Sequence, residues 1–327
     1  MTIKQNNKHQ GTNDHEISGT VTSEEKKEAK IEIPQLGDAI FQGYGINAND
    51  QLKKTADAVV KKYLRQIAEE HECVKNYNIL ILYDSSTMVK GDADNIYNAI
   101  NSFTEKKPLL LILYSNGGVV GSAYLIGKLC REHSHGKFVA VVPRQAKSAA
   151  TLLCCAADEV HMGSLSELGP IDPQINRLPA LGLKNSIEHI AQLVKGTPES
   201  SEMFAKYLHY SLKPIDLGYY ERVAESAMQY AIRLLDTHKD KLPRKPERIA
   251  YTLVYTYKDH GFVIDKTEAK EILGDKILKM NTDEYELGNA LYKALNSIEG
   301  IASLIGHNFY FIGSVDSQAI FTKRNDG

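Results

Sequence analysis

Three short apolar runs, each next to segments with helical spacing, constrain the fold of this chain more than any other feature. The runs are 78–83, 109–114 and 138–142, and each is typical of a buried strand. Apolar residues recur at helical spacing in 50–72, 93–103 and 119–131. Strands that alternate with helices are typical of a parallel sheet covered by helices, so the sequence predicts an α/β fold.

Composition and charge exclude several classes of protein. Of the 327 residues, 43% are hydrophobic and 24% are charged, and the formal net charge is -2. This near-neutral balance argues against nucleic acid or an anionic membrane surface as a partner. No apolar run approaches the roughly 20 residues of a membrane span. The four cysteines form no Cys-x-x-Cys pair, so we expect reduced thiols, no metal site and a cytoplasmic location.

The chain divides into three parts by composition. Residues 1–30 are polar and nearly lack large apolar side chains, which predicts a disordered tail. Residues 31–240 contain the alternating strands and helices of the core. Residues 241–327 form a mainly helical C-terminal extension, which follows a charged, proline-marked linker and includes a short strand at 309–312.

Ser148 follows the apolar run 138–142 and precedes the apolar helical segment 152–157. It therefore lies where a strand gives way to a helix N-terminus, and free backbone amides there favour a developing negative charge. A hydroxyl at this corner is well placed to attack a carbonyl. The alternative is that Ser148 only caps the helix, since serine is a preferred N-cap residue.

A second corner lies at the carboxyl end of the preceding predicted strand. Gly117 and Gly118 can adopt backbone geometry that a side chain would forbid, and can turn their amides toward a carbonyl oxygen. The amide of Ala149 would be the second donor of such an oxyanion hole. A tight turn or a phosphate-binding nest is the alternative. Neither a P-loop nor a Rossmann fingerprint fits the spacing.

Four blocks of sequence closely resemble the serine dehydrogenase proteinase family. They are 115–120, 143–152, 157–163 and 166–174, in which Ser148 and the Gly-Pro-Ile-Asp-Pro segment are the most specific parts. That family is similar to signal peptide peptidase A and to the proteolytic subunit of Clp protease, within the crotonase-like superfold. The resemblance covers about 78–240 and implies a Clp/crotonase-like parallel sheet with covering helices.

The resemblance also implies roles for individual residues. Ser148 matches the nucleophile, and Gly118 and Ala149 match the oxyanion-hole amides. Pro170 stands where Clp-type proteases have their catalytic histidine. Relatives of signal peptide peptidase A use a lysine as general base, which burial can keep neutral. Lys184, at the start of the predicted helix 183–194, is the leading candidate; its alternative is a solvated lysine on a helix surface.

Three further residues are secondary candidates. Lys147 is adjacent to the serine, and we expect it to point away as a solvated charge or substrate contact. Asp172 would orient a base or, as the simpler interpretation, close a turn. His260, before Gly261, would be a base or, as the simpler interpretation, a cation at a helix C-terminus. His161, at the end of a short strand, is expected to be a packed or surface histidine.

The sequence thus predicts an ATP-independent serine endopeptidase that needs no cofactor, acts on a peptide or protein substrate, and assembles as a homo-oligomer. Ser148 would form an acyl-enzyme and a lysine would transfer the proton. Two alternatives stay open: a catalytically silent scaffold that binds an extended peptide, and a thioester hydrolase or other acyl transferase. One departure from the family is Asn116, which replaces the proline of the usual Ser-Pro-Gly-Gly and would make the loop less rigid.

Overall fold

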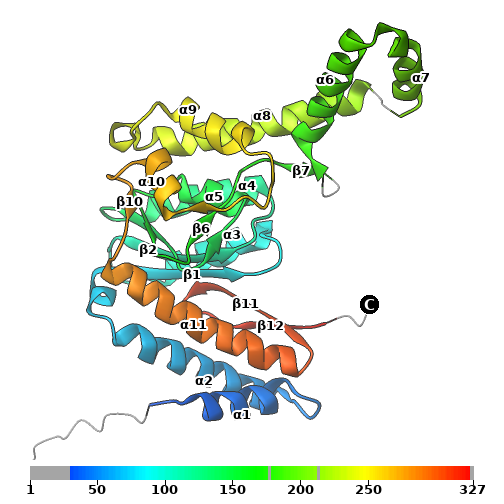
Figure 1. Ribbon diagram of the computed structural model, residues 1–327. Coiled ribbons are helices and arrows are strands. Elements are labelled where there is room, and N and C mark those ends of the chain that lie inside the picture. The colour runs from blue at the N-terminus through cyan, green and yellow to red at the C-terminus, as the bar shows by residue number, and fades with distance from the viewer. Residues whose placement is uncertain (1–29, 176–177, 212–213, 325–327) are drawn as a thin grey trace, which may run out of the picture. The chain divides into compact units, whose positions relative to one another are not determined.

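The computed structural model describes residues 30–175, 178–211 and 214–324 (Figure 1). By its internal contacts the chain divides into Met1–Lys30 and Ile31–Gly327, and the described helices and strands lie in the second unit. The tail predicted at 1–30 falls outside the described residues, apart from Lys30.

Helices and strands alternate through the first half of the second unit, as the apolar pattern predicts. The order is α1 (Ile33–Tyr44), α2 (Asp50–Glu69), β1 (Asn78–Asp84), α3 (Lys90–Ser102), β2 (Leu109–Ser115), α4 (Val120–His133), β3 (Phe138–Val142), β4 (Gln145–Ala146), α5 (Ala149–Cys154), β5 (Glu159–Met162) and β6 (Glu167–Leu168). The three apolar runs are therefore β1, β2 and β3.

The second half is richer in helix. Its elements are a short hairpin of β7 (Gln174–Ile175) and β8 (Leu178–Pro179), then α6 (Ala180–Gly196), α7 (Ser201–Ser211), α8 (Pro214–Asp236), α9 (Pro246–Tyr251), β9 (Ile264–Asp265), α10 (Lys266–Leu273), β10 (Leu278–Lys279), α11 (Asp283–Leu304), β11 (His307–Ser314) and β12 (Ile320–Lys323). A π-helix at Thr252–Thr256 continues α9.

One mixed sheet forms the centre, in the order β10-β5-β3-β2-β1-β11-β12. β10, β5, β3, β2 and β1 run parallel, which confirms the predicted α/β class. β11 joins β1 antiparallel and pairs with β12, which the sequence did not predict. The C-terminal residues thus complete the sheet of the core, and the domain boundary near residue 240 stays a prediction.

The strands are buried on both faces because their side chains alternate between two hydrophobic clusters. In β1, Leu80 and Leu82 face a cluster with α3, α4, α5 and α8, whereas Ile79, Ile81 and Tyr83 face a cluster with α1, α2 and α11. The same alternation runs through β2 and β3. Figure 1 shows the resulting layers, with α11 and α2 on one side of the sheet and α3, α4 and α5 on the other.

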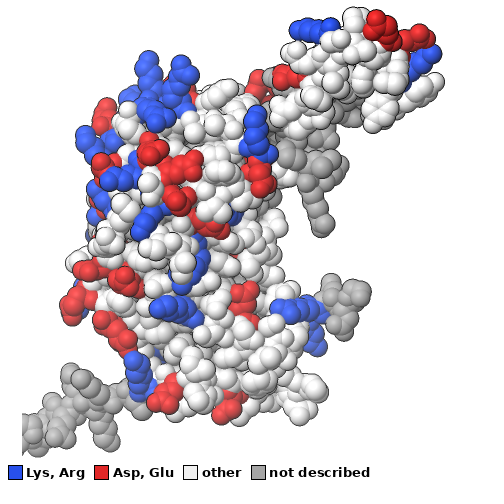
Figure 2. Space-filling view, viewed as in Figure 1, with Lys and Arg blue, Asp and Glu red and all other residues white. Residues whose placement is uncertain are grey.

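The helices after β8 pack against one another and against the core. α6 lies against α8, α7 lies against α6, and α8 lies against α4 and α9. Charged residues of both signs are interspersed over the face in Figure 2, in agreement with the formal net charge of -2. No helix among the described residues is long and apolar enough to cross a membrane.

Candidate active site

The predicted nucleophile lies at a strained corner. Ser148 follows β4, directly precedes α5, and has φ 51° and ψ -118°. A positive φ is uncommon for a residue other than glycine, and such strain costs roughly 1–3 kcal/mol that the surrounding structure must offset. The corner is held because Ala146 pairs with Ser115 of β2 and because the Ala150 amide donates to the Lys147 carbonyl at 2.8 Å. These contacts hold the backbone on both sides of Ser148 in place.

The capping interpretation of Ser148 is wrong. Ser148 occupies the N-cap position of α5, but its side chain makes no capping hydrogen bond. The positive φ departs from the extended backbone typical of a capping serine. A half-buried hydroxyl at this position is left available for another role.

The glycine corner lies directly against Ser148. Gly117 has φ 98°, and a Cβ added to it would be 2.8 Å from the Ser148 Cβ and 2.7 Å from the Lys147 carbonyl oxygen. Gly118 has φ 148°, and a Cβ there would be 2.4 Å from the amide nitrogen of Met88. Any side chain at either position would collide with backbone or with the serine, which explains the pair of glycines.

Two backbone amides remain unpaired beside the serine. Met88 bridges to Gly118 through the Gly117 carbonyl, at 2.8 Å, and the Val119 amide, at 2.9 Å. This bridge leaves the Gly118 amide on the opposite side of the chain. Among the described residues, neither the Gly118 amide nor the Ala149 amide donates a hydrogen bond. Two such donors beside a serine have the arrangement of an oxyanion hole.

Asn116 supplies the rigidity that the missing proline would have given. Its side-chain amide donates to the Ser85 carbonyl at 2.6 Å, and its side-chain oxygen accepts a hydrogen bond from Gln145. The Gly117 amide donates to the Ser115 hydroxyl at 3.1 Å. The loop between β2 and α4 is thus fixed to the loop after β1 and to β4.

Short strands bring three distant segments to this corner. β4 pairs with β6, and β6 pairs antiparallel with β9, with Leu168 opposite Ile264. Lys147 reaches across these strands: its ammonium lies 3.2 Å from the Glu167 carboxylate and donates to the carbonyl of Phe262 at 3.2 Å. Its side chain is only 14% exposed. The expectation that Lys147 is a solvated charge is therefore wrong: it is an internal tie that holds the segment around 262 beside the residue preceding Ser148.

The structure joins two of the secondary candidates, Asp172 and His260. Nδ1 of His260 lies 2.7 Å from the Asp172 carboxylate, although 88 residues separate them in sequence. The Asp172 side chain is 8% exposed and that of His260 is 32% exposed. The hydrogen bond that His260 donates to the Asp172 carboxylate raises the pKa of His260 against the lowering effect of burial. A carboxylate that orients a histidine is the arrangement of a general base and its positioning partner.

The helix-capping interpretation of His260 is wrong, since the π-helix before it ends at Thr256 and the histidine lies in a later turn. Asp172 closes a local contact as well, because its second oxygen accepts from the Gln174 amide at 3.2 Å. Lys184 lies in α6, and its side chain falls outside the part of the chain that the structure describes.

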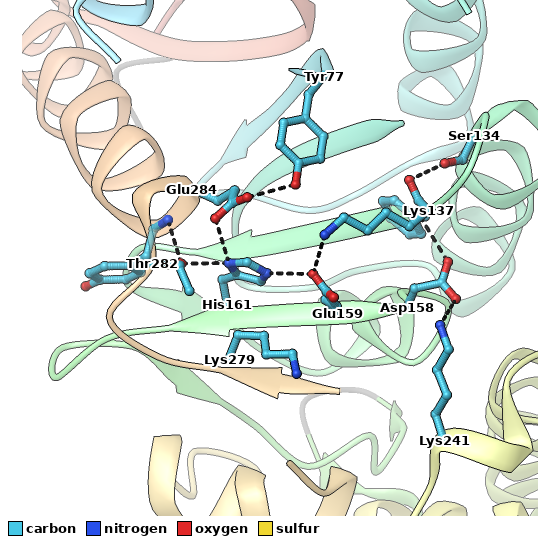
Figure 3. Close-up of polar contacts among 12 residues, drawn as sticks. Tyr77, Ser134, Lys137, Asp158, Glu159, His161, Lys241, Lys279, Thr282 and Glu284 are labelled. Atoms are coloured by element: carbon cyan, nitrogen blue, oxygen red, sulfur yellow. Dashed lines mark hydrogen bonds and ion pairs between the residues drawn. The ribbon is translucent and has the colours of Figure 1, made fainter. Parts of the chain in front are cut away.

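A separate polar cluster surrounds His161, as Figure 3 shows. The buried imidazole lies between Glu159, at 3.3 Å, and Glu284, at 3.7 Å, and contacts the Thr282 hydroxyl at 2.7 Å. The hydrogen bond from His161, aided by Lys137, lowers the pKa of Glu159 to about 2. Both ring nitrogens of the buried His161 have partners in this cluster, so His161 is the packed histidine that the sequence predicts.

No group of His, Cys, Asp and Glu among the described residues could hold a metal ion, and all four cysteines are free and buried. A hollow of about 910 Å³ lies between α1, α3 and the β11–β12 hairpin, and none of the predicted site residues whose side chains the structure describes lines it. The reactive corner at Ser148 is therefore the candidate active site.

The segment that contains Ser148 is similar to known proteins. Residues 65–195 match the family model of the ClpP-like SDH-type serine proteinases. The uncharacterized protein MJ0137 of Methanocaldococcus jannaschii is 29% identical over 203 residues, 62% of this chain and 64% of that protein. The uncharacterized protein MJ1495 of the same organism is 34% identical over 182 residues, 55% of this chain and 56% of that protein. The chain spans less than two thirds of either relative.

Among solved structures, a variant of 1510-N, a membrane-bound stomatin-specific protease, aligns with 68% of this chain and 86% of its own, at 12% identity and a TM-score of 0.40. That likeness is too distant to carry an argument. The family match confirms the predicted resemblance over 65–195 and supports a serine peptidase at the level of the family.

Proposed function

We propose that the chain is a serine-type endopeptidase in which Ser148 forms an acyl-enzyme with its substrate. The observation that carries this proposal is the conformation of Ser148, which has a positive φ, makes no capping hydrogen bond and lies directly against Gly117. Backbone strain of this kind is maintained at functional corners, and a capping or packing role would not require it.

The chemistry begins with attack of the Ser148 oxygen on the carbonyl carbon of a peptide bond, while the general base accepts the proton of the serine hydroxyl. The carbonyl electrons move to the oxygen, and the amides of Gly118 and Ala149 stabilise this oxyanion. Removing one such donor typically costs about 10²–10³ in rate. Collapse of the intermediate expels the amine with a proton from the general base and leaves an ester on Ser148. Water then hydrolyses the ester by the same steps, and no cofactor is required.

For the general base, the geometry favours His260 oriented by Asp172. The pair is formed without substrate, and the tie from Lys147 to the Phe262 carbonyl holds the segment of His260 next to the nucleophile loop. The aspartate fixes the tautomer in which Nδ1 carries a proton and Nε2 is free to accept one from the serine. Lys184 is the second candidate, supported by its position in α6 and by the lysine bases of similar peptidases.

Peptide turnover tests the proposal against its two alternatives. Wild-type protein and Ser148→Ala are assayed with a fluorogenic peptide library and with a panel of acyl-CoA thioesters. A peptidase cleaves peptides, and Ser148→Ala abolishes the cleavage. Turnover of thioesters alone would favour the acyl transferase. Peptide binding that is equal in both proteins, with no turnover in either, would favour the scaffold. Light scattering of the same samples tests the predicted homo-oligomer.

A further inference from the structure

The central sheet ends at β12, which has one unpaired edge. β12 pairs with β11, with Ile320 opposite Tyr310 and Lys323 opposite His307. Among the described residues, no strand pairs with the other edge of β12 (Figure 1). An unpaired strand edge presents backbone N–H and C=O groups with which another extended chain can pair.

The hollow of about 910 Å³ between α1, α3 and the β11–β12 hairpin follows this strand. Ile320, Phe321 and Lys323 of β12 belong to its lining. Successive side chains of a strand point to opposite faces of the sheet, so the hollow reaches both faces of β12. The four residues of β12 span roughly 13 Å, which is the length over which an added strand could pair.

The two walls of the hollow lie on opposite faces of the sheet. One wall includes Tyr44 at the end of α1, whose ring stacks on Phe321 with 4.0 Å between centroids. The other wall is α3, of which Ala99 packs in the hydrophobic cluster on the opposite face from Ala319. A strand added to β12 would therefore place alternate side chains against the α1–α2 loop and against α3.

The wall on the α1 side offers apolar surface. Ile46, in the loop between α1 and α2, lines the hollow and is fully exposed. Tyr44 is held in place because its hydroxyl donates to the buried Asp57 carboxylate at 2.6 Å, and the second Asp57 oxygen accepts from the Gln318 side chain at 2.7 Å. Contact with an apolar side chain would remove Ile46 from water, which favours an apolar residue at this point of a bound segment.

The uncompensated charge of the lining is positive. Lys53 of α2 and Lys323 of β12 both line the hollow, and neither ammonium has an ion-pair or hydrogen-bond partner among the described residues. The acidic residue of the lining, Asp316, is already paired with Arg65. Complementary charge would therefore attract an acidic segment to this edge and repel a basic one.

The wall on the α3 side is polar and neutral. Asn95 and Asn98 lie three positions apart on α3 and share one face of the helix. Both line the hollow, and within the part of the chain that the structure describes neither side-chain amide makes a hydrogen bond. These amides are available to neutral polar side chains on the second face of a bound segment.

We propose that the free edge of β12 binds an extended acidic segment of a partner protein, which joins the sheet as an added strand within this hollow. Acidic residues and an apolar residue of the segment face Lys53, Lys323 and Ile46, and neutral polar residues face α3. The inference is independent of the peptidase function, because no predicted site residue with a described side chain lines the hollow.

The test measures fluorescence anisotropy of labelled peptides with full-length Ser148→Ala protein, in which the proposed cleavage cannot occur. The probe is Glu-Thr-Leu-Thr-Glu-Thr-Glu, which places acidic and apolar residues on one face of a strand and threonines on the other. Replacing each Glu by Lys should weaken binding by at least about 10-fold, because like charges would meet at the edge. N-methylation of the peptide backbone should weaken it by a similar factor, because it removes the donors that pair with β12.

Variants of the protein locate the binding site. Ile46→Asp and Lys323→Glu should each weaken binding of the acidic peptide by about 10-fold, and both side chains are exposed, so we expect the fold to be retained. The matched controls are Leu304→Asp and Lys293→Glu, exposed residues of α11 outside the lining, which should leave the affinity unchanged. Equal effects of the site variants and the controls would overturn the proposal.

Amide hydrogen exchange of 318–324 shows whether the peptide pairs with the strand. The acidic peptide should slow exchange in this segment, and the lysine peptide should not. Absence of binding by the acidic peptide, equal binding of the N-methylated form, or unchanged exchange would each overturn the proposal. Protection of 318–324 that grows with protein concentration in the absence of peptide would show that a second copy occupies the edge, and would overturn the assignment to an acidic partner.

Discussion

If His260 and not Lys184 is the general base, substitution of His260 should lower the peptidase activity far more than substitution of Lys184. His260→Gln removes the proton acceptor, and Asp172→Asn keeps the shape of its partner but removes the charge that holds it at 2.7 Å. General-base catalysis contributes about 10²–10⁴-fold, so His260→Gln should lower kcat/KM of a fluorogenic peptide by that factor. Lys184→Met should retain the rate to within about threefold, a change of less than 1 kcal/mol in barrier height.

The histidine base also predicts the direction in which kcat/KM changes with pH. A base works only when neutral, so kcat/KM must fall as pH drops through the pKa of His260. The hydrogen bond that His260 donates to Asp172 raises this pKa above its ordinary value, and loss of the aspartate charge removes that effect. The acid limb of Asp172→Asn should therefore move to lower pH, while its plateau falls because the imidazole is no longer oriented.

The assay is kcat/KM between pH 5 and 9 for wild type and the three variants, with fluorophosphonate labelling as a check that the Ser148 corner is intact. Activity of His260→Gln within threefold of wild type would refute the histidine base. Loss of activity in Lys184→Met, together with an acid limb that Asp172→Asn does not move, would restore the lysine. Thermal unfolding of each variant excludes loss of fold as the cause.

Three further predictions concern the backbone and the buried charges. Gly117→Ala should slow fluorophosphonate labelling by about 10²-fold or more, since its Cβ would collide with Ser148. The control Gly121→Ala, whose Cβ meets nothing within 4 Å, should label normally and gain up to about 1 kcal/mol in unfolding free energy. Equal labelling of the two variants would contradict the geometry. Lys147→Met should lower the unfolding free energy measured in urea by about 1–3 kcal/mol, because it removes the hydrogen bonds of a mostly buried ammonium. An unchanged unfolding midpoint would show that the contacts of Lys147 do not stabilise the fold. The lowered pKa of Glu159 contributes stability that is complete above its ordinary pKa of about 4.5 and is lost as pH falls toward about 2. Between these pH values the unfolding free energy of wild type should therefore drop by about 2–3 kcal/mol more than that of Glu159→Gln. Parallel acid unfolding curves of the two proteins would contradict this.

Much of the fold could be predicted because its signals are local. A buried strand such as 138–142 consists of apolar residues throughout, and its bounds in the structure are the predicted ones. The N-cap of α10 is equally local, because the Asp265 side chain accepts from the amides of Thr267 and Glu268, two and three residues on. These features depend on residues within one turn or one strand.

The antiparallel edge and the Asp172–His260 pair could not be predicted in the same way. β11 joins β1 across more than 220 residues of sequence, and no local pattern specifies the partner of a strand. Asp172 and His260 were both candidates, but only the pairing of β6 with β9 brings their segments together. The Ser148 strain is also a tertiary effect, since the residues around it are compatible with an ordinary N-cap. The side chain of Lys184 lies outside the described residues, so its role stays a prediction.

Identification of the residue that a fluorophosphonate modifies tests the central claim most directly. Intact protein is treated with the probe, digested, and the modified residue is located by mass spectrometry, with Ser148→Ala as the control. The account predicts one phosphonylated residue, Ser148, in wild type and none in Ser148→Ala. An unmodified wild type, or equal labelling of both proteins at another residue, would contradict a nucleophilic serine at this corner.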